Sequence, residues 1–240
     1  MRLPVIQGTI KRRILANFRV DPETIQRELP DRFRPKLQDG SAVAGVCLIR
    51  LEHVRPLNLP ALVGLSSENA AHRVAVTWLE DGLTREGVFI SRRDTNSQIN
   101  HLFGGRIFPG EHHHAHFSVE ESDSAISLKM KSDDAAVAVE VVGRISPGLP
   151  PASIFSSLAE ASAFFEKGSV GYSVTSERER LDGLELRTQN WSVEPLEVSH
   201  VYSSYFGDKT KFPDGAIEFD HALIMRNLEH EWHTADDLYI

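Results

Sequence analysis

Short segments of alternating or nearly continuous apolar residues follow one another along most of this chain and are typical of β-strands. Residues 9–18 and 42–51 are two of the clearest. The second is apolar at almost every position, which predicts a strand buried on both faces. Further strands are expected at 73–79, 86–92, 113–119, 125–130, 136–144, 172–175, 184–188, 196–206 and 216–225. The pattern therefore predicts a mainly β protein.

Two segments carry helix signals instead. The run Asp21-Pro22-Glu23 supplies an N-cap, a first-position proline and an acidic first turn, and Pro30 ends that helix. After Pro150-Pro151, Ser153 can cap a second helix, because apolar residues recur at helical spacing from Ile154 to Phe165. No linker or internal repeat divides the chain. We expect one α+β domain over residues 1–240, built as a barrel or a strongly curved sheet with a few flanking helices.

Composition limits which partners the protein can bind and indicates its cellular compartment. The formal charge is −8, with 34 acidic and 26 basic side chains, so the long-range field repels nucleic acid and anionic membrane surfaces. Cys47 is the only cysteine, which excludes an intrachain disulfide and favours a reducing compartment. The N-terminus lacks the apolar core of a signal peptide, and no run approaches the ~18 apolar residues of a membrane span. We therefore expect a cytoplasmic protein without nucleic-acid or membrane partners.

Histidines crowd the segment 112–116. Histidine titrates near neutral pH and is the commonest metal ligand, so such a cluster is either a site or a solvated edge. If this segment is a strand, His112, His114 and His116 share one face, while His113 and Ala115 share the other, which is the apolar core face. The residues alone leave open whether the first face lines an interior or meets water.

A metal site is one interpretation of the first face. Residues two apart on a strand are separated by ~6.6 Å and residues four apart by ~13 Å, so an ion can bridge His112 and His114, or His114 and His116, but not all three. The third ligand would be Glu68, His72, His101 or His221. Because a His-x-His pair is a weak signal, we expect no cofactor, with zinc as the alternative.

Several arginines could bind a carboxylate, since the planar guanidinium forms paired hydrogen bonds with it. The candidates near the histidines are Arg73, Arg92, Arg93 and Arg106. Strand alternation places Arg92 on the same face as Val88 and Ile90, so Arg92 is the arginine that we expect to point inward.

Four segments, read in order, resemble a protein family. They are Phe18-Arg-Val-Asp-Pro-Glu, Gly87-Val-Phe-Ile-Ser, the strand centred on Ala115, and Trp191-Ser-Val-Glu-Pro-Leu-Glu-Val198. Together they are similar to an uncharacterised bacterial family within the acetoacetate decarboxylase-like superfamily, over nearly the whole chain. The resemblance implies a closed antiparallel β barrel with flanking helices and a ligand cavity inside it.

The resemblance also implies a site. In the decarboxylases a lysine forms an imine with the β-keto acid, next to a second cation. In this chain His112 occupies the position of the imine-forming lysine and His113 that of its neighbour. A family glutamate falls near Glu68, and a family arginine falls close to Lys11 and Arg12. Because only Lys36 lies between Lys11 and Lys129, imine chemistry at the family position is not available.

Three functional hypotheses follow. The first is a barrel that binds a small organic acid, as a divergent lyase-like enzyme without the imine lysine. In it His112 or His114 is the general acid or base, Glu68 orients ligand or water, and Arg73 or Arg92 receives a carboxylate. The ligand-binding set that we expect is Arg73, Arg92, His113 and Lys11. The alternatives are a metal-dependent hydrolase or lyase using a His-x-His pair, and a non-catalytic ligand-binding module. The sequence leaves homo-oligomerisation open.

Overall fold

The computed structural model describes residues 4–103, 110–177 and 179–240, and in them the chain is mainly β, as predicted. The long strands are β1 (Ile6–Val20), β4 (Ser41–Pro56), β5 (Leu65–Glu80), β6 (Leu83–Thr95), β7 (His112–Glu121), β8 (Ala125–Ser132), β9 (Ala138–Ile145), β10 (Val170–Val174), β11 (Arg180–Thr188), β12 (Glu194–Ser203) and β13 (Ile217–Tyr239). The short elements are β2 (Arg34–Pro35), β3 (Leu37–Gln38), the helices α1 (Pro22–Gln26), α2 (Gln98–Phe103) and α3 (Leu158–Glu166), and the 3-10 turn η1 (Ala61–Val63).

The helix starts were predicted with mixed success. Asp21 caps α1, since its carboxylate accepts a hydrogen bond from the backbone N–H of Thr24 at 2.7 Å, although the helix ends at Gln26, before Pro30. The predicted cap at Ser153 is wrong, because α3 begins later and Ser157 caps it. The hydroxyl of Ser153 instead donates to Asp220 at 2.7 Å, so a tertiary contact holds this segment outside the helix.

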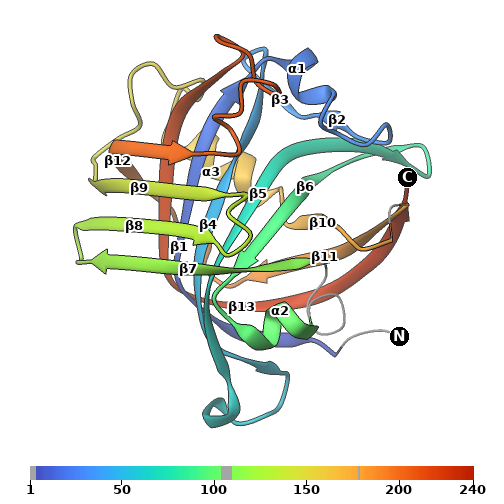
Figure 1. Ribbon diagram of the computed structural model, residues 1–240, viewed down its shortest axis with the longest axis vertical. Coiled ribbons are helices and arrows are strands. Elements are labelled where there is room, and N and C mark those ends of the chain that lie inside the picture. The colour runs from blue at the N-terminus through green and yellow to red at the C-terminus, as the bar shows by residue number, and fades with distance from the viewer. Residues whose placement is uncertain (1–3, 104–109, 178) are drawn as a thin grey trace.

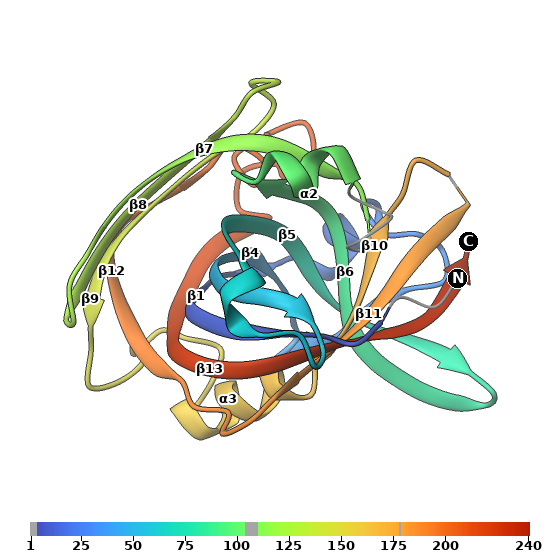
Figure 2. The same cartoon turned by 90° about the horizontal axis from the view of Figure 1, so that it is seen from below.

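One curved sheet runs through the described residues in the strand order β11-β10-β6-β7-β8-β9-β12-β13-β1-β4-β5-β2, and β5 also pairs with β6 and β11 with β13 (Figure 1). Figure 2 shows β7, β8, β9 and β12 curving away on one side of the central strands, and β10 and β11 on the other. The sheet is not wholly antiparallel, because β6 pairs in parallel with β7 and with β10. The chain passes through α2 between β6 and β7, and parallel neighbours require such a crossover. Closure into a barrel and organisation as one domain stay predictions.

The central strands bury side chains on both faces, as the continuous apolar pattern of residues 42–51 predicted. In β4, Val46 and Leu48 belong to one apolar core, which includes residues of β8 and β9. Val43, Cys47 and Leu51 belong to a second core, which includes Phe164 and Phe165 from α3. Successive strand residues point to opposite faces, so each step along β4 alternates between the two cores.

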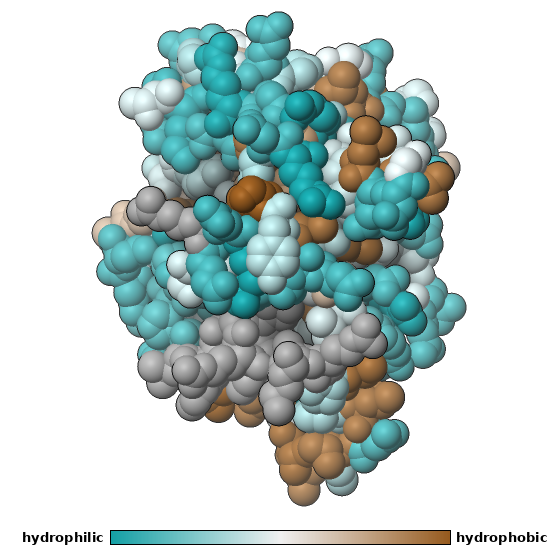
Figure 3. Space-filling model, turned by 90° about the vertical axis from the view of Figure 1, so that its right-hand side faces the viewer, coloured by the Kyte–Doolittle hydropathy of each residue, from teal (hydrophilic) through white to brown (hydrophobic). Residues whose placement is uncertain are grey.

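Apolar side chains are also exposed at one end of the molecule. The connection between β4 and β5 carries Leu57, Leu59, Leu62 and Val63, and β5 begins with Leu65; all five are exposed. Figure 3 shows apolar side chains gathered on the projection at its lower end. No helix within the described ranges is long and apolar enough to cross a membrane.

Two histidines of the described core are held neutral by burial. His72 is fully buried against the rings of Tyr205 and Phe206, with ring centroids 4.8 and 5.8 Å away. Burial lowers the pKa of His72 to about 3, and the nearby charge of Arg92 adds to this effect. Burial also lowers the pKa of His230 to about 4. Both side chains are therefore uncharged at neutral pH.

We predict that acid destabilises the fold in part through these two residues. Below pH 6.5 the unfolded chain binds protons that the native imidazoles do not, so stability is complete near pH 7 and falls as the pH drops towards 4. Each histidine should account for about 1 to 2 kcal/mol of lost stability at pH 5. Urea unfolding at pH 7 and pH 5 measures this loss. His72→Phe should remove about 1 to 2 kcal/mol of the difference, whereas the same change at exposed His200 should remove little. An equal loss of stability between pH 7 and pH 5 in the two variants would contradict the prediction.

Candidate functional site

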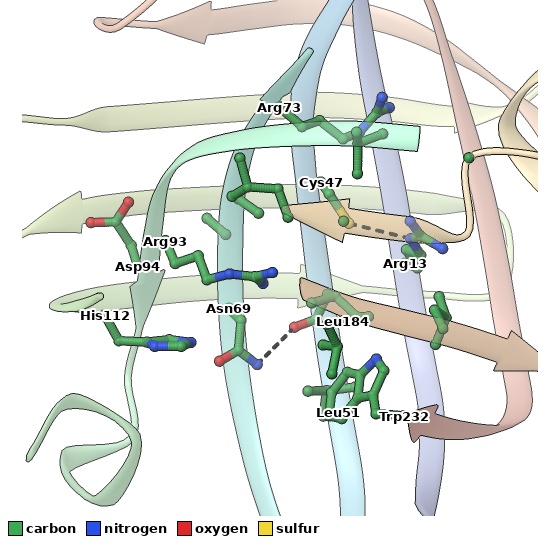
Figure 4. Close-up of a pocket in the computed structure, with 18 of the residues that line it drawn as sticks. Arg13, Cys47, Leu51, Asn69, Arg73, Arg93, Asp94, His112, Leu184 and Trp232 are labelled. Atoms are coloured by element: carbon green, nitrogen blue, oxygen red, sulfur yellow. Dashed lines mark hydrogen bonds between the residues drawn. The ribbon is translucent and has the colours of Figure 1, made fainter. Parts of the chain in front are cut away.

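A cavity of about 120 Å³ lies on the α3 face of the central strands, between β4, β5 and β6 on one side and β10, β11 and β13 on the other. Its apolar wall includes Ile49, Leu51, Ile90, Leu184, Leu186 and Trp232. The polar residues that line it are Arg13, Asn69, Arg73, Arg93, Asp94, His112 and Ser169, together with Cys47. Figure 4 shows Arg93 and His112 pointing into the cavity and Asp94 pointing away from it.

Strand register aligns part of this wall in one row. Cys47 of β4 is opposite Ala71 of β5, Ala71 is opposite Arg93 of β6, and Arg93 is opposite His112 of β7. Direct partners in neighbouring strands present their side chains on the same face. The guanidinium of Arg93 and the imidazole of His112 therefore lie side by side, and the small Ala71 leaves space beside them.

A β-bulge decides which arginine of β6 belongs to the cavity. His72 pairs with Arg92 but the next residue, Arg73, pairs with Ile90, so Ser91 is an extra residue in β6. A bulge reverses the alternation of side chains beyond it. The prediction that Arg92 shares the face of Ile90 is therefore wrong, and Arg93 lies on that face instead. Arg92 instead bonds Asp94 at 2.8 Å and Asp134 at 3.0 Å.

His112 presents a neutral imidazole to the cavity. Its Nδ1 lies 3.2 Å from the backbone carbonyl oxygen of Gly110, to which it donates, so Nε2 is left as an acceptor. Burial lowers the pKa of His112 to about 3, and the adjacent Arg93 charge contributes to the same shift. The free protein thus combines an uncharged nitrogen base with a fixed cation.

Three guanidiniums give the cavity a positive charge. Arg13 donates to the sulfur of Cys47 at 3.3 Å, and Arg93 donates to the hydroxyl of Ser173 at 2.9 Å. Neither these arginines nor Arg73 has a carboxylate within 4.0 Å in the described part of the chain. Burial lowers the pKa of Arg73 and of Arg93 to about 10, so both remain protonated at neutral pH.

A buried chain of hydrogen bonds holds Arg73. Its Nη2 donates to Oδ1 of Asn17 at 2.5 Å, and Nδ2 of Asn17 lies 3.1 Å from Nε2 of His221. Nδ1 of His221 lies 2.5 Å from a carboxylate oxygen of Asp220. Arginine can only donate, which orients the Asn17 amide and makes His221 Nε2 an acceptor, so the Nδ1 hydrogen of His221 faces Asp220.

Strand pairing explains how this series of hydrogen bonds crosses the sheet. Asn17 pairs with Gly45 and Gly45 pairs with Arg73, so the bond from Arg73 to Asn17 passes over β4 where β4 has no side chain. A β-carbon at Gly45 would lie 2.3 Å from the backbone oxygen of Ala16. At the other end, a bulge in β13 frees Asp220, which is skipped in the pairing with β1. Burial acts to raise the pKa of Asp220, but its hydrogen bonds outweigh burial and the pKa is lowered.

The hydrogen bond to Asn17 uses only one of the three guanidinium nitrogens of Arg73. Nε and Nη1 of Arg73 have no hydrogen-bond partner, although the residue is only 3% exposed. Buried donors without partners are costly, so these two groups are available to an acceptor that enters the cavity.

Other residues that the sequence singled out lie elsewhere. Glu68 points to the opposite face of β5, where it is buried in an ion pair with Arg12 at 2.5 Å. Burial raises the pKa of Glu68, although Arg12 and Arg50 oppose this shift. Lys11 is exposed and donates to Asn227 at 2.9 Å. The roles expected for Glu68 and Lys11 stay predictions.

The histidine segment is divided between three environments. His112 lines the cavity, as described above, whereas His113 lies on the other face, 3.6 Å from Asp134. His114 and His116 share the face of His112 but contact Asp133 outside the cavity. Arg106 falls outside the described residues.

The sequence reasoning missed Arg13, Asn17 and Asn69. Alternation along β1 offered a signal, since Arg13 and Leu15 share a face and the intervening Ile14 belongs to the other core. No comparable signal marked Asn17, whose partners come from β5 and β13.

Solved structures of similar fold define the class. An acetoacetate decarboxylase-like enzyme from Sphingomonas wittichii RW1 superposes with a TM-score of 0.58 at 11% identity, covering 99% of this chain and 92% of that one. Acetoacetate decarboxylase from Legionella pneumophila gives 0.62 at 10% identity, covering 98% and 88%. The enduracididine biosynthesis enzyme MppR, complexed with pyruvate, gives 0.58 at 11% identity, covering 100% and 91%. These likenesses show an acetoacetate decarboxylase-like fold.

The family is shown by sequence. The profile of family DUF2071, an uncharacterized conserved protein, matches residues 8–215. This chain belongs to that family, and the resemblance seen in the sequence is confirmed. The search of curated proteins found no match to this chain.

We predict that Asn17 is essential to the arrangement of Arg73. Asn17→Ala removes the acceptor of Arg73 and the partner of His221 together, and should lower the free energy of unfolding by about 2 to 4 kcal/mol. Urea unfolding measures the change. Asn69→Ala, on the same face but bonded only to Ser67 and Ile49, is the matched control and should cost much less. Equal losses of unfolding free energy in the two variants would show that the hydrogen-bond chain through Asn17 does not stabilise the fold more than an ordinary side-chain hydrogen bond.

Proposed function

We propose that this protein binds a small organic acid in the cavity of Arg93 and His112, and that it acts on it as a lyase-like enzyme without an imine. The family is uncharacterised, and the fold is shared with enzymes of acetoacetate decarboxylase type. The proposal therefore depends on the side chains of this cavity.

The observation that carries the proposal is the excess of positive charge. Arg13, Arg73 and Arg93 converge on one small cavity, and Asp94, the carboxylate at its wall, bonds Arg92. A buried charge is costly without a partner, whereas a bound carboxylate would accept charge-assisted hydrogen bonds from these guanidiniums. The free Nε and Nη1 of Arg73 are donors of the same kind.

The size and polarity of the site favour a short acid. The cavity has a volume of about 120 Å³ and an apolar wall that includes Leu184, Leu186 and Trp232. MppR, which has this fold, was solved with pyruvate. A carboxylate bound at Arg93, with a short carbon chain against the apolar wall, would use both properties of the cavity.

The chemistry would be enolate rather than imine chemistry. None of the described residues that line the cavity is a lysine. When a C–C or C–H bond next to a carbonyl breaks, its electron pair moves to the carbonyl oxygen, and Arg13 or Arg73 would stabilise the enolate. Nε2 of His112 would accept or return the proton. The catalytic roles predicted for His114 and Glu68, and the binding roles predicted for Arg92, His113 and Lys11, are not needed for this step.

A non-catalytic binding module would use the same cavity. It differs from the enzyme only in turnover, which NMR of acetoacetate or of another β-keto acid incubated with the protein would detect. If the protein binds the β-keto acid but does not convert an excess of it, the binding module is favoured.

We predict that pyruvate and acetoacetate bind through Arg93. Arg93→Gln should weaken binding roughly 10- to 100-fold, because a hydrogen bond to a charged group contributes about 1.5 to 3 kcal/mol. Isothermal titration calorimetry measures the affinity. Arg144→Gln is the control, since Arg144 is an exposed partner of Glu197, and it should bind as the wild type does. Unchanged affinity in Arg93→Gln would place the acid elsewhere.

We further predict that a lysine at residue 112 restores imine formation. The wild type should give no borohydride-trapped adduct with acetoacetate or pyruvate, because imidazole cannot form an imine. In His112→Lys, burial and the adjacent Arg93 should depress the amine pKa and allow trapping near neutral pH. Mass spectrometry locates the adduct.

His113→Lys is the matched control for this variant. It places the same amine one residue further along β7, on the opposite face of the strand, and should not be trapped. An adduct on a native lysine of the wild type, such as Lys36, would show that imine chemistry persists at another position.

A further inference from the structure

His114, His116 and Asp133 form a second cluster of chemically active side chains, separate from the cavity. Each offers one ligand atom, and these atoms all lie within 4.8 Å of one another. Nδ1 of His114 is 2.7 Å from one carboxylate oxygen of Asp133, and Nε2 of His116 is 3.1 Å from the other. Of the two histidine pairs considered from the sequence, this group contains His114 with His116, and His112 is not part of it.

Backbone pairing holds the three residues together. His114 and His116 are two residues apart on β7 and share a face, with ring centroids 5.5 Å apart. Asp133 begins the turn between β8 and β9, and its backbone N–H donates to the carbonyl of His114 at 3.0 Å. The ligands therefore come from one strand and from a turn that is hydrogen-bonded to it.

We propose that His114, His116 and Asp133 bind a transition-metal ion, with zinc as the ion of choice. Four ligands around zinc at ~2.1 Å lie roughly 3.4 Å apart. One ligand atom from each of the three residues lies within 4.8 Å of the other two, so these atoms must approach one another by up to about 1.4 Å to reach that spacing. Two imidazoles and one carboxylate select zinc or a similar ion over magnesium and calcium, which prefer oxygen ligands.

Gln98 of α2 supplies the outer support that a metal-bound histidine needs. Its Nε2 lies 3.0 Å from Nε2 of His114. In the metal-free protein the amide donates to this nitrogen, and His114 Nδ1–H donates to Asp133. With the ion on Nδ1, the ring hydrogen moves to Nε2 and the amide turns so that its oxygen accepts it. A hydrogen bond at the second ring nitrogen fixes the imidazole and strengthens the metal bond.

Exposure leaves room for a further ligand. The side chain of His114 is 12% exposed, but those of His116 and Asp133 are 80% and 48% exposed. Three protein ligands with solvent on one side leave the fourth position of the ion to water, as in zinc sites that bind exogenous ligands.

The test is zinc titration of protein purified without a histidine tag, followed by calorimetry and thermal unfolding. The wild type should bind one zinc ion and unfold at a higher temperature with it, since binding to the native state stabilises the fold. His114→Ala, His116→Ala and Asp133→Ala should each abolish the stoichiometric binding. Gln98→Ala should weaken it ~10-fold. Magnesium should give no shift in any variant.

His113→Ala is the matched control, because His113 makes the equivalent contact to Asp134 on the other face of the same strand. It should bind zinc as the wild type does. Absence of stoichiometric zinc binding, or equal loss in His113→Ala and His116→Ala, would overturn the proposal. Because acid binding in the cavity is tested with Arg93→Gln, the two proposals fail independently.

Discussion

Burial of both faces of the central strands is the constraint on which the site depends. β4 contributes to two apolar cores at once, so every step along it carries a side chain from one core to the other. A polar residue in these strands therefore enters one of two enclosed environments. Arg12 and Arg13 are neighbours on β1, so their side chains point to opposite faces: Arg12 pairs with Glu68, and Arg13 lines the cavity.

Bulges then adjust this alternation at particular residues. The extra residue Ser91 turns Arg93 towards the cavity and leaves Arg92 with Asp94 on the other face. The skipped residue Asp220 reaches His221, at the end of the hydrogen-bond chain that holds Arg73. Both irregularities lie beside a charged group of the site, as is common for bulges next to functional residues.

The buried arginines on the two faces of the sheet have different kinds of hydrogen-bond partner. On one face Arg12 and Arg92 each meet carboxylates, which compensates the cost of their burial. On the cavity face the arginines meet a thiol, a hydroxyl and an amide, which are neutral acceptors. Neutral partners orient a guanidinium but leave its charge for a ligand. This contrast links the fold to the proposed binding of an acid.

The sequence by itself determined the mainly β class, the position of most strands, the N-cap at Asp21, the two-sided burial of β4 and the family resemblance, because these follow from local periodicity, capping chemistry and ordered motifs. It also marked His112 and Arg73, which line the cavity. Only the tertiary structure decided that Arg93 replaces Arg92 and that Glu68 belongs with Arg12. It likewise joined His114 and His116 to Asp133. The reason is physical: alternation is a local property, whereas bulges and cross-strand partners are set by the register between segments far apart in the chain.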